Sequence, residues 1–235
     1  CGEDPRGSPE ASAETRTFTS EDGVELHASL FTEGGERAPS VVLLHGLGGD
    51  RSGWKFMANS LEANGFCALA IDFRGHGEST TRSDGGSLDW RRFEAGDYRA
   101  MTLDVKAAVE QLRKEPSCDA ERLGLLGASL GANIALVYAA SAVDVRSVAL
   151  LSPGRNYRGV EIGSTVSGID GRPVFLAAAR ADGGGYSART VEDLAANLGG
   201  AVRTRIEEGD SHGVNLIGAL RDLDRDLVRW FEETL

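Results

Sequence analysis

The sequence has few of the residues that stiffen or cross-link a small protein, with 6 prolines and 3 cysteines among 235 residues. A chain of this length can bury a sizeable core without disulfides or metal ions. It also lacks any apolar run of the length that a membrane-spanning helix needs. The sequence therefore predicts one globular domain rather than a disulfide scaffold or a helical membrane protein.

Positive charge and metal ligands are also scarce. The chain carries 25 Lys and Arg against 36 Asp and Glu, a formal net charge of -11, and no basic cluster offsets it. Such a chain repels nucleic acid and anionic lipid, so we expect neither as a partner. Two of its 4 histidines, His45 and His76, together with Asp72, lack the spacing of a metal cluster, and no phosphate-binding loop is present. We therefore expect no metal and no cofactor.

Glycine is plentiful, and the 31 glycines separate strand-like from helix-like segments. Strands are expected at 41–44, 66–73, 145–151, 174–179 and 202–206, helices at 54–64, 97–114, 188–198 and from 216 to 230, and an antiparallel hairpin at 15–20 and 24–32. Strands that alternate with helices form a mainly parallel sheet with helices on both faces. The predicted fold class is α/β, with its ligand site at the carboxyl ends of the strands.

The first residues have a different composition. Residues 1–14 hold no large apolar side chain and are rich in Pro, Ser and Glu, which predicts a disordered tether ahead of a domain over 15–235. The chain opens on Cys1, as does a mature bacterial lipoprotein after its signal peptide is removed. Acyl chains on Cys1 would anchor the protein to the cell envelope of a bacterium, and we expect no other membrane contact. A trimmed or incidental terminal cysteine is the alternative.

The other two cysteines, Cys67 and Cys118, each precede a predicted strand. Because those two strands are expected to lie apart in the sheet, we expect free, partly buried thiols. A secreted location would keep a disulfide open as an alternative.

The segment 122–136 predicts a buried strand, a sharp turn and a helix, and its turn carries Gly-x-Ser-x-Gly at 127–131. Gly127 and Gly131 flank Ser129 where a tight strand-to-helix turn leaves no room for a β-carbon. The serine backbone can then be strained and its hydroxyl raised above the sheet. A glycine-rich structural turn is the alternative interpretation.

Other chemically useful residues also follow predicted strands. Leu47 follows 41–44, Asp182 follows 174–179, and His212 follows 202–206. A serine hydroxyl is a weak nucleophile until an imidazole takes its proton, and a carboxylate must orient that imidazole. Asp210 is the rival for Asp182, but on the same short loop it can hardly reach the far ring nitrogen of His212. The sequence therefore predicts that Ser129, Asp182 and His212 converge.

Several conspicuous residues also have structural interpretations. His45 and His76 lie in glycine-flanked turns, where histidines more often hold loops together. Asp72 and Arg74 are expected to form a pair that braces their turn. Four aromatic residues could line an acyl pocket or belong to the core: Phe73, Trp90, Phe93 and Tyr157.

The sequence resembles the α/β-hydrolase family, and within it the small serine esterases and lysophospholipase-like hydrolases. The matching segments are 41–49, 72–79, 127–131, 179–182 and 209–213. This resemblance implies Ser129 as the nucleophile, His212 as the base and Asp182 as the orienting acid. It also implies an oxyanion hole made by the backbone N–H groups of Leu47 and Leu130.

Two features depart from the family pattern. Three glycines follow Asp182 where many relatives carry aliphatic residues or Pro, which predicts a looser loop, and Ala132 replaces a frequent second glycine. The segment between the strands at 145–151 and 174–179 is too short for a large helical cap, so we expect a minimal cap and an open site.

The expected reaction is hydrolysis of a small-molecule carboxylic ester through an acyl-serine, with short acyl or aryl esters as the first choice. Thioesters, monoacylglycerols, lysophospholipids and peptides are alternatives within the same fold. An alternative of another class is a surface lipoprotein that has lost catalysis and acts as a binding module.

Overall fold

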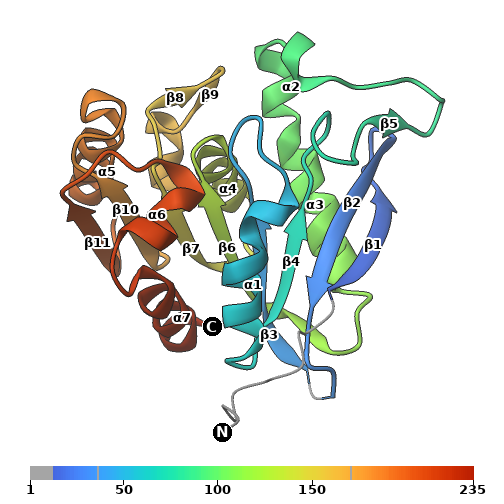
Figure 1. Ribbon diagram of the computed structural model, residues 1–235, viewed down its shortest axis with the longest axis horizontal. Coiled ribbons are helices and arrows are strands. Elements are labelled where there is room, and N and C mark those ends of the chain that lie inside the picture. Colours follow the sequence, from blue (N-terminus) through green and yellow to red (C-terminus); the bar gives the residue numbers. More distant parts are fainter. Residues whose placement is uncertain (1–12, 36, 170) are drawn as a thin grey trace, which may run out of the picture.

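The computed structural model describes residues 13–35, 37–169 and 171–235 (Figure 1). Cys1 and residues 1–12 of the expected tether lie outside this part of the chain, and the first strand begins at Glu14. Among the described residues, no helix has both the length and the apolar character needed to cross a bilayer.

The centre of the molecule is a mixed sheet with the strand order β1-β2-β4-β3-β6-β7-β10-β11, and β5 pairs with β2 at its side. The run from β4 to β11 is parallel, whereas β1 and β2 are antiparallel to their neighbours. The strands are β1 (Glu14–Thr19), β2 (Val24–Phe31), β3 (Ala38–Leu44), β4 (Cys67–Ile71), β5 (Thr81–Arg82), β6 (Cys118–Ala128), β7 (Val145–Leu151), β10 (Val174–Ala179) and β11 (Val202–Glu207). The predicted α/β fold with an N-terminal hairpin is confirmed.

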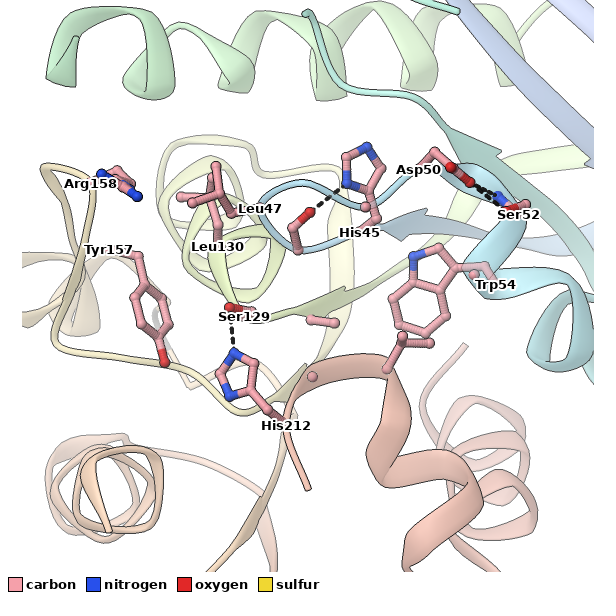
Figure 2. A pocket seen from close by; sticks show the side chains of 16 residues that line it. His45, Leu47, Asp50, Ser52, Trp54, Ser129, Leu130, Tyr157, Arg158 and His212 are labelled. Atoms are coloured by element: carbon pink, nitrogen blue, oxygen red, sulfur yellow. Dashed lines mark hydrogen bonds between the residues drawn. The ribbon is translucent and has the colours of Figure 1, made fainter. Parts of the chain in front are cut away.

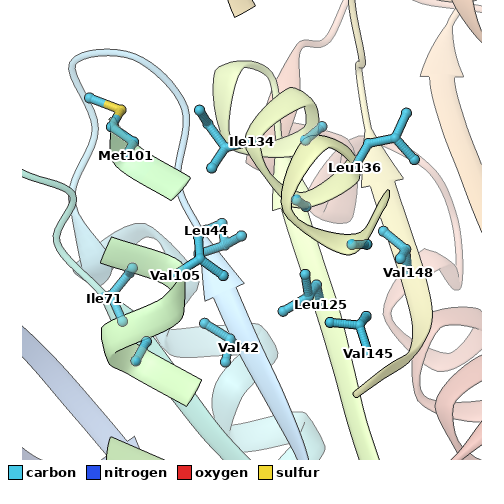
Figure 3. Packing of buried hydrophobic residues seen from close by; sticks show 14 of the residues in the cluster. Val42, Leu44, Ile71, Met101, Val105, Leu125, Ile134, Leu136, Val145 and Val148 are labelled. Atoms are coloured by element: carbon cyan, nitrogen blue, oxygen red, sulfur yellow. The ribbon is translucent and has the colours of Figure 1, made fainter. Parts of the chain in front are cut away.

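Helices cover both faces of this sheet. On one face lie α3 (Met101–Leu112), α4 (Leu130–Ser141) and α5 (Tyr186–Asn197), and on the other lie α1 (Lys55–Glu62) and α7 (Leu223–Thr234). Side chains of β3 alternate between the two layers, so that Val42 and Leu44 pack under α3 and α4 (Figure 3) while Val41 and Leu43 join the other layer. A strand buried on both faces must be apolar throughout, which explains why 41–44 has no polar residue.

The connections between the strands contain several short elements, some of which lie above the carboxyl ends of the strands (Figure 1). The stretch 80–96, expected to be mostly loop, contains β5, a 3-10 helix at Trp90–Arg92 and the start of α2 (Ala95–Arg99). Between β7 and β10 the chain forms a hairpin of β8 (Asn156–Tyr157) and β9 (Val160–Glu161), then a 3-10 helix at Gly163–Ile169. The cap is therefore minimal, as predicted.

The prediction of one long final helix is wrong. The chain forms α6 (Leu216–Ala219) and then α7, with Asp222 in left-handed backbone conformation (φ 59°) between them. Aspartate tolerates that conformation better than most residues. A side chain of β11 stabilises the break between the two helices, because Arg205 donates a hydrogen bond to the carbonyl oxygen of Arg221 (2.9 Å). The apolar stripe therefore continues through two helices.

The expectation of free thiols is also wrong, because Cys67 and Cys118 form a disulfide with their Cα atoms 5.5 Å apart. The two cysteines begin β4 and β6, which flank β3 on either side. The pairing of β3 with β6 shifts register between Pro39 and Ser40, at the end of the sheet where the cysteines lie. The Cα–Cα distance between the two cysteines is shorter than two regular strand spacings, and this close approach coincides with the irregular start of β3.

Asp72 and Arg74 do not pair with each other as predicted. Asp72 accepts hydrogen bonds from the guanidinium and the backbone N–H of Arg51. Arg74 is buried between Asp104 of α3 and Asp22 of the β1–β2 turn, with N–O distances of 2.7 Å to each. Each of the two residues therefore has its partners elsewhere in the sequence.

Candidate active site

Ser129 occupies a strained turn between β6 and α4, with φ 55° and ψ -120°. Close backbone contacts require glycine on either side of Ser129. A Cβ on Gly127 would lie 2.3 Å from the carbonyl oxygen of Gly131, and a Cβ on Gly131 would lie 2.2 Å from the carbonyl oxygen of Leu44. The expectation that this turn has no room for β-carbons at its flanks is therefore confirmed. Figure 2 shows the serine hydroxyl beside the His212 ring, among the residues that line the pocket.

A chain of hydrogen bonds joins three side chains from separate loops. His212, after β11, has its Nε2 2.7 Å from the hydroxyl of Ser129 (Figure 2). Its Nδ1 lies 2.8 and 2.9 Å from the two carboxylate oxygens of Asp182, after β10. The Asp182 side chain is 5% exposed and that of His212 is 43% exposed. Asp210 is exposed and forms no hydrogen bond or ion pair with His212.

The loop that carries His212 is held by a residue that the sequence analysis missed. Ser152, directly after β7, is buried with φ 50°, and its hydroxyl accepts a hydrogen bond from the backbone N–H of Gly213 (2.9 Å). Tyr157 packs edge-on against the His212 ring, with centroids 6.2 Å apart, and burial raises the pKa of its hydroxyl. The Ser-Pro-Gly at the end of the 145–151 strand was the available signal for a functional turn.

The three glycines after Asp182 have a conformational reason. Gly183, Gly184 and Gly185 all have positive φ, at 56°, 67° and 83°. Backbone hydrogen bonds from Gly184 to Ala181 and from Gly185 to Asp182 close the turn. L side chains rarely adopt this conformation, so the glycines let the chain fold back sharply enough to bury the Asp182 carboxylate.

Two backbone N–H groups beside Ser129, those of Leu47 and Leu130, form no hydrogen bond with any described residue. The carbonyl of Gly46, in the same peptide group as the Leu47 N–H, accepts hydrogen bonds from His45 Nδ1 (2.7 Å) and from the Gly49 N–H (3.1 Å). Because the C=O and N–H of a trans peptide point in opposite directions, these bonds fix the direction of the Leu47 N–H.

The ring of His45 is neutral, so that one of its nitrogens donates a hydrogen bond and the other accepts one. Burial lowers the pKa of His45 to about 4. Its Nε2 accepts a hydrogen bond from the backbone N–H of Phe73 (3.1 Å), which leaves the ring proton on Nδ1. The expectation that His45 holds its loop together agrees with these contacts.

A cavity of about 570 Å³ opens above Ser129 and His212. Of the four aromatic residues proposed from sequence, Tyr157 lines it. The other three do not: Phe73 is buried elsewhere, Trp90 stacks on His76, and Phe93 packs edge-on against Tyr98. Trp54, Val214 and Arg158 also line the cavity and were not anticipated. Among the described residues, no group of three or more His, Cys, Asp or Glu side chains could hold a metal ion.

The family model for the alpha/beta hydrolase fold matches residues 39–207. The AB hydrolase superfamily protein YisY of Bacillus subtilis is 32% identical over 130 residues, which are 54% of this chain and 42% of that protein. The mouse sn-1-specific diacylglycerol lipase ABHD11 is 28% identical over 141 residues, 58% of this chain and 40% of that protein. The chain thus spans about two fifths of the length of the curated relatives it matches.

Solved structures share the fold over nearly the whole chain. The Pyrococcus furiosus esterase Pf2001 superposes with a TM-score of 0.76 at 18% identity and covers 100% of this chain and 95% of its own. A dienelactone hydrolase from Anabaena variabilis has a TM-score of 0.71 at 21% identity and covers 95% of this chain and 99% of its own. Because the family model matches residues 39–207, which is more than half of the chain, the chain belongs to the α/β-hydrolase family.

Proposed function

We propose that the protein is a serine hydrolase that cleaves carboxylic esters through an acyl-serine intermediate. The observation that carries the proposal is the hydrogen-bonded chain from Ser129 through His212 to Asp182. In this proposal Ser129 is the nucleophile, His212 the general base and Asp182 the carboxylate that orients the imidazole. The N–H groups of Leu47 and Leu130 form the oxyanion hole.

The reaction takes place in two steps. His212 Nε2 takes the proton of Ser129 as its oxygen attacks the ester carbonyl, and the two N–H groups stabilise the tetrahedral oxyanion. His212 then gives the proton to the leaving alcohol, and the acyl group remains on Ser129. A water molecule, deprotonated by the same imidazole, attacks the acyl-serine and releases the acid. Each oxyanion donor contributes about 10²–10³ in rate.

Small esters with short acyl or aryl groups are the proposed substrates. The cavity of about 570 Å³ is lined on its cap side by one short hairpin, through Tyr157 and Arg158, and its size suits a small molecule. The esterase and dienelactone hydrolase among the similar structures support a hydrolytic reaction on an ester bond. Thioesters, monoacylglycerols, lysophospholipids and peptides undergo the same chemistry and belong in the substrate screen.

Hydrolysis of p-nitrophenyl esters and labelling by a fluorophosphonate test the proposal. The parent protein should hydrolyse acetate and butyrate esters and be labelled on Ser129. Ser129→Ala should lose both properties, whereas Ser141→Ala, on an exposed serine at the far end of α4, should keep them. A parent protein that neither reacts with the probe nor cleaves any ester in the screen would instead favour the non-catalytic binding module.

A further inference from the structure

The hairpin above the cavity carries an arginine where its backbone favours another residue. Asn156 pairs with Glu161 and Tyr157 with Val160, so Arg158 and Gly159 are the two central residues of the turn. Both have positive φ, at 53° and 84°. Turns of this kind favour Asn, Asp or Gly at the first central position, and an arginine there is strained by about 1 kcal/mol. Strained residues are frequent at binding and catalytic sites, which makes this side chain a candidate for a role in the cavity.

The tip of this hairpin is held firmly over the cavity. Buried Asn133, on the helix that follows Ser129, donates hydrogen bonds to the carbonyl oxygens of Gly154 (2.7 Å) and Val160 (2.9 Å). A Cβ on Gly159 would lie 2.5 Å from the Cβ of Ala95, so the tip packs tightly on α2. Arg158 therefore projects from a backbone whose position is fixed relative to Ser129.

Arg158 brings an uncompensated positive charge to the cavity. Among the described residues that line the cavity, it is the one Lys or Arg, and it forms no ion pair with any part of the chain that the structure describes. In contrast, Arg155 at the base of the same hairpin pairs with Asp193. The Arg158 side chain is exposed, so its guanidinium is accessible to a molecule bound in the cavity.

The opposite end of the cavity is negative. Figure 2 shows Asp50 across from Arg158, with Leu47 and His45 between them. Hydrogen bonds from Ser52 lower the pKa of Asp50 and keep it ionised. This carboxylate is already satisfied by the N-terminus of the 3-10 helix at Arg51–Trp54, so it repels an anion and leaves Arg158 as the group that lacks a counter-ion.

We propose that Arg158 binds a carboxylate on the substrate, so that the preferred esters are monoanions with their charge at the hairpin end of the cavity. The inference rests on the proposed ester hydrolysis at Ser129. A guanidinium presents two parallel N–H groups that match one carboxylate, and a single arginine neutralises one charge. The apolar wall of Leu47, Leu130 and Trp54 would hold the rest of the molecule.

Two esters of the same acyl length test this proposal: p-nitrophenyl butyrate, which is neutral, and mono-p-nitrophenyl succinate, which ends in a carboxylate. Arg158→Gln should lower kcat/KM for the succinate about tenfold, as expected for one charged hydrogen bond near solvent, and leave the butyrate within about twofold. Arg158→Lys should restore part of the loss. Arg155→Gln, the matched control outside the cavity, should change neither.

A stability measurement separates recognition from a structural role. Arg158→Gly should raise the unfolding midpoint, because glycine adopts this backbone without strain. The same variant should lower the ratio of kcat/KM for the succinate ester to kcat/KM for the butyrate ester. A structural role for the arginine would lower the midpoint instead. The parent's preference should also weaken at high salt. An unchanged ratio in Arg158→Gln would overturn the proposal.

A binding experiment keeps this result distinct from failure of the proposed hydrolysis. In the Ser129→Ala background, which cannot form an acyl-serine, calorimetry with mono-p-nitrophenyl succinate should show binding that Arg158→Gln weakens about tenfold. If the parent cleaves neither ester but this difference is present, the hydrolase proposal fails and the carboxylate site stands. If both esters are cleaved and no difference is found, the carboxylate site fails alone.

Discussion

At the scale of single residues, Asp182 and Asp210 offer the sharpest comparison, because both lie near His212 in sequence or in space. Asp182→Asn should lower kcat by about 10³–10⁴, since an amide cannot stabilise the imidazolium and favours the wrong ring tautomer. Asp210→Asn removes an equal charge from an exposed position and should leave kcat within about twofold. Steady-state kinetics on p-nitrophenyl butyrate measures both. Equal losses in the two variants would contradict the assignment of Asp182.

Gly131 tests the contact between the Ser129 turn and β3. Its Cβ would lie 2.2 Å from the carbonyl oxygen of Leu44, so Gly131→Ala should destabilise the fold by about 3 kcal/mol or more. Gly96, inside α2, has nothing within 4 Å of an added Cβ. Gly96→Ala should therefore stabilise slightly, by about 0.5–1 kcal/mol. Urea unfolding of both variants measures the change in the free energy of unfolding. An unchanged free energy of unfolding in Gly131→Ala would show that the turn is not packed as described.

The buried histidines predict a loss of stability on acidification. Burial lowers the pKa of His45 and of His76 from 6.5 to about 4, and their ring centroids lie 5.0 Å apart. Between these pH values the unfolded chain binds more protons than the folded protein, so stability falls as pH drops from 6.5 to 4. The loss reaches about 3 kcal/mol for one such histidine.

The histidine contribution is measured as a difference between variants. Burial also raises the pKa of Asp104 to about 6, which has the opposite sign, because the folded protein then binds the extra proton. Urea unfolding of the parent and of His76→Gln should therefore be compared at about pH 7 and about pH 5. The parent should lose more stability than the variant over this interval. Parallel profiles would mean that His76 does not titrate as a buried base.

At the scale of elements, one buried side chain couples the helix behind Ser129 to the cap hairpin. Asn133→Ala would leave the carbonyl oxygens of Gly154 and Val160 and the N–H of Gly154 without their partner, at a cost of about 2–4 kcal/mol. It should also reduce the preference for the anionic ester, since the hairpin tip loses its anchor. Asn197→Ala, at an exposed asparagine with one bond to Asp193, should do neither.

The same scale explains which elements could be predicted. Strands buried on both faces and amphipathic helices carry long periodic patterns, so β3, β7, β10 and α5 were anticipated close to their observed bounds. The single helix expected at 97–114 is divided, because α2 ends at Arg99 and α3 begins at Met101. Strands β8 and β9 have two residues each, too few for any periodicity to be visible. The break between α6 and α7 was missed because the apolar stripe continues across it.

At the scale of the whole molecule, the Cys67–Cys118 disulfide ties the two strands that flank β3. The bridge spans 51 positions of the sequence, and closing a loop of that size stabilises a fold by about 4 kcal/mol in the chain-entropy description. Reductant should lower the parent's urea midpoint towards that of a Cys67→Ala, Cys118→Ala double variant. The double variant itself should not respond to reductant. If the parent is unfolded and refolded with reductant and its urea midpoint does not change, that result would contradict the disulfide.

The sequence by itself determined the alternation of strands and helices, the strained turn at Ser129, and the convergence of Ser129, Asp182 and His212. It could do so because each of these residues follows a strand, and parallel strands end at one edge. The tertiary structure alone decided the disulfide, the partners of Asp72 and Arg74, and the place of Arg158 above the cavity. These depend on which strands are neighbours and how loops fold over the sheet, and such long-range contacts leave no periodic mark in a single sequence.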